Sequence, residues 1–365
     1  MAGRAIVLVL LSGILGNAAA DWYSEAGIEG RWFLQSPLDP EQESRGLSVH
    51  FQTEYHTSWD GGDQSFTFKP FIRLDQRDDQ RTHFDIREAV WIHAGEGWEV
   101  RLGLDKVFWG VTEVYHLVDI INQTDVLENP DGEQKLGQPL FKYSMERDWG
   151  TLDAYLLPWF RERPYPGRNG RLRSHPRVDV DQARYDNDLE DHYPSFALRW
   201  SRSIGDWDVG LSHFHGTSRE PRFTPGTDGG GNPVLVPNYD LINQVSIDVQ
   251  ATVGDWLWKL EAIHRSGQEE GYFAATGGFE YTYVGVAESD ADLGVLVELM
   301  YDDRGDAATT PFNQDVFFGL RWVANDVPGS EVLGGIVVDW ENGGRFYNLE
   351  ASRRLGNAWK ASVQM

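Results

Sequence analysis

Hydrophobic and polar residues alternate over residues 244–253, and the pattern resumes over residues 256–265 with Trp256, Trp258, Leu260 and Ala262 on one side and Lys259, Glu261 and Arg265 on the other. In the first run every odd position is apolar: Val245, Ile247, Val249, Ala251 and Val253. Because successive side chains of a β-strand point to opposite faces, each run has one apolar face and one polar face. Gly254 and Asp255 join the runs, which predicts a hairpin of two amphipathic strands.

Similar alternation recurs along the chain and predicts about seventeen strands between residues 23 and 365. Connections after even-numbered strands are mostly tight and rich in Gly, Asp and Asn. Those after odd-numbered strands include all the long ones: residues 110–138, 162–194, 217–241 and 302–312. Outer-membrane barrels have short periplasmic turns and long extracellular loops. The pattern therefore predicts an all-β fold, a transmembrane antiparallel up-and-down β-barrel of about 16–18 strands.

Tryptophans support this interpretation, because five of them lie in or directly after predicted tight turns: Trp98, Trp149, Trp207, Trp256 and Trp359. Amphipathic rings collect at the membrane interface, so we expect these residues to form a periplasmic aromatic girdle. The alternative is a set of aromatics that pack the hairpins of a soluble sheet.

Residues 1–20 are typical of a secretory signal, with Arg4 at the charged start, an apolar run over residues 5–15 and three alanines before Asp21. We expect cleavage before Asp21, so that residues 21–365 form the barrel. No later window has the ~20 apolar residues of a transmembrane helix. The chain has no Cys, which excludes a disulfide-stapled fold and thiol chemistry.

The C-terminus is unusual for this fold, because seventeen strands are an odd number and the last residue, Met365, is not aromatic. Bacterial outer-membrane barrels close with an even number of strands. We expect either that the chain lacks a closing strand or that one strand is misassigned. Direct pairing of the first strand with residues 357–365 in an even-numbered barrel would refute a missing strand.

The formal net charge is −25, and removal of the signal, whose one charged residue is Arg4, leaves −26. Such an acidic chain does not bind nucleic acid through its overall field. We expect its partners to be outer-membrane lipid, lipopolysaccharide and small solutes. The sequence says nothing about the oligomeric state.

The segment 84–125 resembles a large, poorly characterised family of porin-like outer-membrane β-barrel proteins of Gram-negative bacteria. The resemblance is carried by Arg87-Glu88-Ala89, Arg101-Leu102-Gly103, Phe108-Trp109-Gly110 and the run from Asp119 through Asn122 to Asp125. Gln123 stands where the family commonly has Pro. The resemblance implies a barrel in the outer membrane and does not identify a solute.

The residues of this motif also have a local physical interpretation. A strand runs to Trp109, ends at Gly110 and enters a long loop. Asp119, Asn122 and Asp125 would accept hydrogen bonds from turn and cap backbone groups there. Inward folding of this loop, which would narrow the pore, is a hypothesis.

Ten charged residues fall on the predicted lumen face: Asp85, Arg87, Arg101, Asp105, Arg199, Asp248, Lys259, Glu261, Glu298 and Arg321. They form either a mutually compensating network or rings of charge that set pore selectivity.

The loop after residue 160 carries six arginines: Arg161, Arg163, Arg168, Arg171, Arg173 and Arg177. Guanidinium groups pair with carboxylates and phosphates. They could pair with the acidic run Asp186 to Asp191, hold lipopolysaccharide phosphates at the rim, or favour anionic solutes in the pore.

No metal or cofactor site is expected. His213 and His215 lie two apart on one strand face, but no third ligand accompanies them. Acidic clusters such as Asp302 and Asp303 are expected to be solvated, with divalent-cation bridges to lipopolysaccharide as the alternative.

These observations predict a porin or porin-like channel for small solutes in the outer membrane of a Gram-negative bacterium, not an enzyme. The alternatives are a structural barrel without transport and, less favoured, a barrel hydrolase. No nucleophile elbow, nucleotide-binding loop or zinc-spacing motif occurs. Ser212 and His213 are adjacent and so point to opposite faces, which separates that pair.

Overall fold

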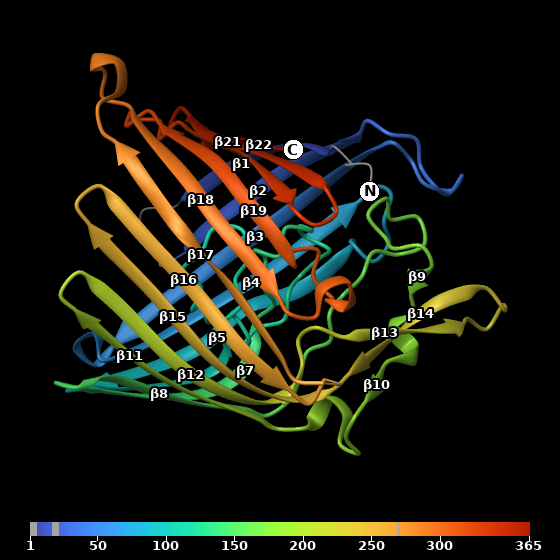
Figure 1. Cartoon of the computed structure of the whole chain (residues 1–365), viewed down its shortest axis with the longest axis horizontal. Helices are drawn as coiled ribbons and strands as arrows, with labels where there is room; N and C mark the ends of the chain where they lie inside the picture. The colour runs from blue at the N-terminus through green and yellow to red at the C-terminus, as the bar shows by residue number, and fades with distance from the viewer. Residues whose placement is uncertain (1–5, 17–21, 269) are drawn as a thin grey trace.

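The computed structural model describes residues 6–16, 22–268 and 270–365, with the backbone alone for residues 6–16. These residues form one closed 18-stranded antiparallel sheet (Figure 1). Each strand pairs with the next in the order that follows, and β22 pairs with β1. The strands are β1 (Ile6–Gly16), β2 (Trp22–Phe33), β3 (Arg45–Trp59), β4 (Gln64–Asp75), β5 (His83–Gly95), β6 (Trp98–Asp105), β7 (Gln138–Arg147), β8 (Gly150–Leu157), β11 (Ser195–Ile204), β12 (Trp207–Thr217), β15 (Leu241–Val253), β16 (Trp256–Ser266), β17 (Tyr272–Tyr283), β18 (Asp292–Asp302), β19 (Gln314–Val323), β20 (Glu331–Asp339), β21 (Arg345–Leu355) and β22 (Trp359–Gln364).

The loops after β8 and β12 carry structure of their own. There β9 (Arg177–Val178), β10 (Arg184–Tyr185), β13 (Arg222–Thr227) and β14 (Pro233–Tyr239) form a separate four-stranded sheet. The β13–β14 hairpin projects beyond the barrel end (Figure 1). The sequence predicts a long connection over residues 217–241, as observed, but does not predict the two strands that it contains. Val234 and Val236 on β14 are buried, so the hairpin has an apolar side that is removed from solvent.

Short one-turn 3-10 helices occur in five connections of the described chain: η1 (Asp60–Gly62), η2 (Val180–Gln182), η3 (Glu190–His192), η4 (Val286–Glu288) and η5 (Gly305–Ala307). Among the described residues, no helix has the length and apolar composition needed to span a bilayer.

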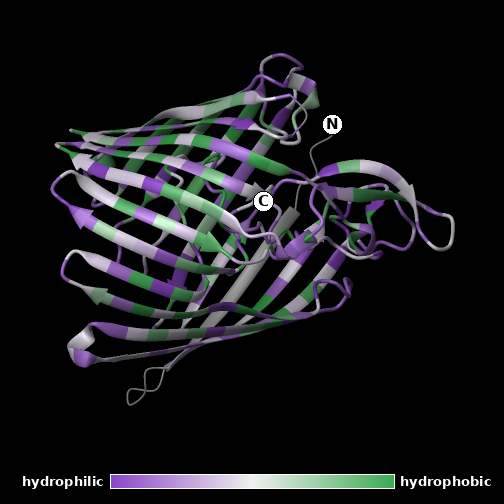
Figure 2. Cartoon of the chain, turned by 90° about the horizontal axis from the view of Figure 1, so that it is seen from below, coloured by the Kyte–Doolittle hydropathy of each residue, from purple (hydrophilic) through white to green (hydrophobic). Residues whose placement is uncertain are grey.

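The outer surface of the barrel is apolar because one face of each strand carries large hydrophobic side chains. Leu47, Val49 and Phe51 on β3, and Leu320 on β19, are 41–54% exposed. Figure 2 shows the resulting alternation of hydrophobic and hydrophilic residues along the strands. A soluble protein rarely exposes a continuous apolar surface of this extent, whereas a lipid-facing barrel requires one. The predicted transmembrane barrel is confirmed.

The connections are sorted by length between the two ends of the barrel. Tight turns such as residues 96–97, 205–206 and 254–255 lie at one end. The long connections lie at the other end and cover residues 34–44, 106–137, 158–194, 218–240 and 303–313. This asymmetry agrees with the short periplasmic turns and long extracellular loops predicted above.

The closure of the barrel differs from the sequence expectation. The predicted first strand does not pair directly with residues 357–365, because β1 lies between β2 and β22 and pairs with both. β1 falls in the segment predicted to be a signal, where an apolar run of eleven residues has the length of a strand as well as of a signal core. Removal of this segment and a missing closing strand stay predictions.

Phe51 and Gln52 provide a matched test of the two barrel faces. Phe51 faces outward and is 42% exposed, whereas Gln52 lines the interior. We expect Phe51→Arg to lower the free energy of unfolding in lipid vesicles by about 2–4 kcal/mol, because it places a charge in the hydrocarbon region. Gln52→Arg should change it by less than about 1 kcal/mol. Equal losses in denaturant titrations would contradict the assignment of the faces.

Candidate functional site

The connection between β6 and β7, residues 106–137, folds into the barrel interior, and we call it the inner loop. Its first turn is held by Asp119, whose Oδ1 accepts hydrogen bonds from the backbone N–H groups of Trp109 (2.7 Å) and Gly110 (3.1 Å). Glycine at position 110 permits this close approach, because a Cβ there would lie 2.5 Å from Nδ1 of His116 and would force the imidazole to move. The Trp-Gly pair therefore marks a close turn at the entry to the inner loop.

The Asn122 side chain closes the two limbs of the inner loop against each other, and the Asp125 side chain caps a turn within one limb. The Asn122 side chain accepts from the N–H of Val107 (2.8 Å) and donates to the carbonyls of Asp105 (2.8 Å) and Leu136 (2.9 Å). Asp125 accepts from the N–H of Leu127 (3.2 Å). The side chain of Gln123, at the position where the resembled family has Pro, accepts from the N–H of Thr124 (3.0 Å).

Two buried carboxylates of the barrel wall anchor the middle of the inner loop. Glu261 on β16 accepts from Val111 N (2.7 Å), from both N (3.0 Å) and Oγ1 (2.8 Å) of Thr112, and from Val118 N (3.1 Å). Glu298 on β18 accepts from the N–H groups of Glu113 (2.7 Å) and Val114 (3.0 Å). The two glutamates are 0% and 2% exposed. The loop backbone thus supplies the donors that these buried charges need.

His116 adds a charged contact at the same point. Its Nε2 lies 3.0 Å from Glu133 of the inner loop, and its Nδ1 lies 3.7 Å from Glu261. Burial acts to lower the pKa of His116, but the interactions with Glu133 and Glu261 outweigh it and raise the pKa to about 10. His116 is therefore cationic at neutral pH and compensates the Glu261 charge.

Apolar side chains press the inner loop against one side of the barrel. Trp109, Val118 and Ile121 pack against an inner-wall patch that includes Leu140 on β7 and Phe214 on β12. A second cluster joins Val114 and Tyr115 of the loop to residues of β18, β19 and β20. The inner loop thus fills the lumen along the side that runs from β7 to β20.

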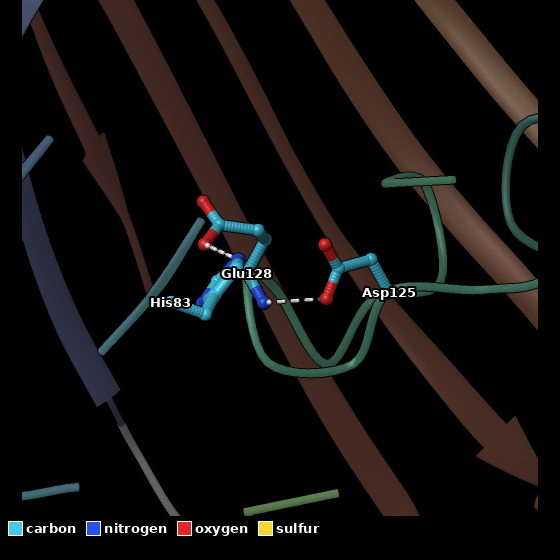
Figure 3. Close-up of side chains that lie close together, drawn as sticks. All are labelled: His83, Asp125 and Glu128. Carbon is cyan, nitrogen blue, oxygen red and sulfur yellow. Dashed lines mark hydrogen bonds and ion pairs between the residues drawn. The ribbon is translucent and has the colours of Figure 1, made fainter. Parts of the chain in front are cut away.

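The far limb of the inner loop is tied to the opposite wall through ion pairs. Arg73 on β4 binds both carboxylate oxygens of Glu128 (2.8 and 2.6 Å), and Arg87 on β5 binds Asp125 (2.6 Å). His83, Asp125 and Glu128 bring potential metal ligands within 4.8 Å of one another (Figure 3). Because the two guanidinium groups already occupy these carboxylates, the cluster is an ion-pair junction between loop and wall.

Beyond the inner loop, the lumen keeps a cavity of about 600 Å³. Residues 128–134 of the inner loop and Glu113 form one side of it, and strands β2 to β4 and β19 to β22 form the other. At the tip, Asn129 donates to Oε1 of Gln364 (2.8 Å), and Gln364 donates to Oδ2 of Asp131 (2.9 Å). The inner loop therefore spans the barrel from β6 to β22 beside the cavity.

The ten charged residues predicted for the lumen all point into the barrel, and each has a polar partner there. Asp85 pairs with Arg87 and Arg161, Arg101 with Asp105, and Arg199 with Asp248. Lys259 and Arg321 both contact Glu113, while Glu261 and Glu298 hold the loop backbone. Of the ten, Arg321 lines the cavity.

Five of the six arginines of the loop after β8 bind residues outside that loop. Arg161 pairs with Asp85 (2.8 Å), Arg173 with Asp39 (2.5 Å) and Arg177 with Asp228 (3.4 Å). Arg163 and Arg171 donate to Gln123 and to the carbonyls of residues 35–36, respectively. Arg168 is exposed, and its carbonyl accepts from Arg173 (2.8 Å).

The strand with two histidines carries them on the outer face. His213 is exposed, and His215 contacts the Tyr193 hydroxyl (3.1 Å) and the Asn243 side chain (3.0 Å). Ser212 is buried on the inner face. The adjacent serine and histidine thus lie on opposite sides of the wall.

Several residues that line the cavity are not predicted from the alternation of the strands. They are the inner-loop acids Glu113, Glu128, Asp131 and Glu133 and the wall residues Glu29, Arg73, Glu331 and Glu350. A usable signal in the sequence is the density of acidic residues, six within residues 113–133 of a single loop.

Comparison with known proteins finds structural likeness at low sequence identity. No protein-family profile and no curated protein sequence matches the chain. A complex of Salmonella typhi OmpF with daunomycin aligns over 99% of this chain and 97% of its own, with 8% identity and a TM-score of 0.48. The Vibrio cholerae outer membrane protein OmpT, in a trimer form, aligns over 99% of this chain and 97% of its own, with 10% identity and a TM-score of 0.46. The outer membrane channel DcaP of Acinetobacter baumannii aligns over 99% of this chain and 96% of its own, with 11% identity and a TM-score of 0.45.

Glu261→Gln tests the wall anchor of the inner loop. The neutral amide is a weaker acceptor and keeps one oxygen, so we expect the free energy of unfolding to fall by roughly 2–4 kcal/mol. Glu99→Gln is the matched control, because Glu99 is half-buried and pairs with Arg101 on its own strand. Denaturant titration of both variants should show the larger loss for Glu261→Gln. Equal losses would contradict the anchoring role.

The raised pKa of His116 makes the stability that this residue contributes depend on pH. Because its pKa is raised from the ordinary 6.5 to about 10, its contribution to stability is complete below pH 6.5 and is lost as pH rises through about 10. We expect the difference in free energy of unfolding between the wild type and His116→Gln to shrink from pH 7 to pH 11. A constant difference would show that the charge of His116 does not hold the loop.

Proposed function

We propose that this protein is a porin-like channel of the Gram-negative outer membrane, which lets small solutes diffuse through the cavity beside the inner loop. The observation that carries the proposal is the division of the lumen. One side is filled by apolar packing of the inner loop, while a polar cavity of about 600 Å³ persists on the other. A barrel of eighteen strands is wide enough to leave such a path.

The anchoring of the inner loop supports a fixed constriction. Its contacts reach β4, β5, β16, β18, β19 and β22, so the loop is held around most of the wall. A constriction of this kind restricts solutes by size and charge. The resemblance of residues 84–125 to porin-like barrels supports the same function.

A structural barrel without transport and a barrel hydrolase are the competing functions. A structural barrel needs no polar cavity beside its inner loop. The separation of Ser212 from His213 by the barrel wall disfavours a hydrolase built on that pair. Release of fatty acid from phospholipid vesicles, abolished by substitution of one rim serine, would establish the hydrolase instead.

Planar-bilayer recording tests the channel directly. We expect stepwise conductance from purified, folded protein, and a larger conductance when residues 111–118 are replaced by two glycines. Removing the part of the loop that packs on the wall widens the path, so the increase should be roughly twofold or more. Folded protein that gives no current would refute the channel and favour the structural barrel.

The β13–β14 turn provides the control. Shortening residues 228–232 removes the exposed tip of that hairpin and leaves the lumen untouched. We expect the wild-type conductance from this variant. An increase equal to that of the inner-loop variant would show that loop shortening in general, and not the constriction, changes the current.

A further inference from the structure

The cavity beside the inner loop has a strong excess of negative charge. Its described lining includes eight carboxylate side chains against three cationic ones, Arg73, Arg321 and Lys360, with His50 aside. The excess does not by itself define a binding site. It matters because, under the function proposed above, these groups line the route that a solute takes.

Three of the carboxylates are compensated by close ion pairs. Glu29 pairs with Arg31 (2.6 Å), Arg73 (2.9 Å) and Arg81 (2.7 Å). Arg73 also neutralises Glu128 (2.6 Å), and Arg321 neutralises Glu113 (2.6 Å). Two of the three cations of the cavity, Arg73 and Arg321, are therefore already engaged.

Glu133 and Glu25 have histidine neighbours. Glu133 contacts the cationic His116 (3.0 Å), and Glu25 lies 3.8 Å from His50. His116 is shared with Glu261, so one cation serves two carboxylates there.

Asp131, Glu331 and Glu350 hydrogen-bond to neutral donors. Asp131 accepts from the side chains of Asn129 and Gln364 (2.9 Å to the latter). Glu350 accepts from Asn348 (3.1 Å) and Gln364 (3.3 Å), and Glu331 accepts from the Ser352 hydroxyl (2.8 Å). Neutral donors satisfy these oxygens without cancelling their charge. The three residues come from the inner loop, β20 and β21, so uncompensated charge faces the cavity from both sides.

The six arginines of the loop after β8 do not offset this charge, because none of them is among the described residues that line the cavity. Their acidic partners, Asp85 on β5 and the loop residues Asp39 and Asp228, are likewise not among the described residues of the lining. The lining thus argues against the anion-selective alternative raised by the sequence.

We propose that the channel selects cations, taking small cationic solutes in preference to anions of similar size, and that Asp131, Glu331 and Glu350 set this preference. A pathway lined by charge of one sign concentrates counter-ions and repels ions of the same sign. Because salt screens such fields, the preference should be strong at 0.1 M salt, where the screening length is about 10 Å, and weak at 1 M, where it is about 3 Å.

Reversal potentials across planar bilayers in a KCl gradient test this proposal on the full-length protein. We expect a severalfold preference for K⁺ over Cl⁻ that declines between 0.1 and 1 M salt. The triple variant Asp131→Asn, Glu331→Gln, Glu350→Gln should lose at least about half of that preference. The control removes three exposed carboxylates outside the cavity, as Asp186→Asn, Asp188→Asn and Glu190→Gln, and should keep it.

Lys360→Gln is a second variant, for which we expect the opposite change in K⁺ preference. It removes a cation that lines the cavity, so the K⁺ preference should rise. A current with no K⁺ preference would overturn the selectivity and leave the channel intact, whereas no current from folded protein would overturn both. An unchanged preference in the triple variant would overturn the role of these three residues.

Discussion

The burial of Glu261 and Glu298 on the inner wall is the constraint on which the interior of this barrel depends. A carboxylate without water needs several hydrogen-bond donors, and a β-strand cannot supply them from its own backbone, which is committed to neighbouring strands. The inner loop provides six such donor contacts within residues 111–118. The loop is therefore inside the barrel because the wall carries these charges, and the charges are tolerated because the loop is there.

This arrangement divides the lumen into two unequal parts. Where the inner loop meets β7 to β20, apolar residues such as Val118 and Ile121 exclude water. Where it faces β2 to β4 and β19 to β22, the contacts are ion pairs and amide hydrogen bonds, and a cavity remains. Outside, the strands expose an apolar surface that suits lipid. Architecture and electrostatics together support the proposed diffusion of small cations through this cavity.

Local patterns in the sequence account for much of the fold. Period-two alternation locates the barrel strands, and the spacing of Asp119 and Asn122 anticipates their bonds to backbone groups of the same loop. The partnership of Glu261 with Thr112 joins residues far apart in the chain, which no local pattern encodes. The β13–β14 hairpin was missed because prolines and glycines obscure its alternation. The apolar run Ile6–Gly16 suits both a signal and a strand, so periodicity alone does not separate them.

Site-specific crosslinking tests the inward position of the inner loop most directly, and the absence of native cysteines makes it clean. The side chains of Asn129 and Gln364 are 2.8 Å apart across the loop tip. Cysteines at these two positions, treated with a short bifunctional thiol reagent in the folded barrel, should crosslink efficiently. Cysteines at 129 and at Asp228, on the projecting hairpin, should not. Failure of the first pair, or equal crosslinking of both, would contradict an inner loop that spans the lumen.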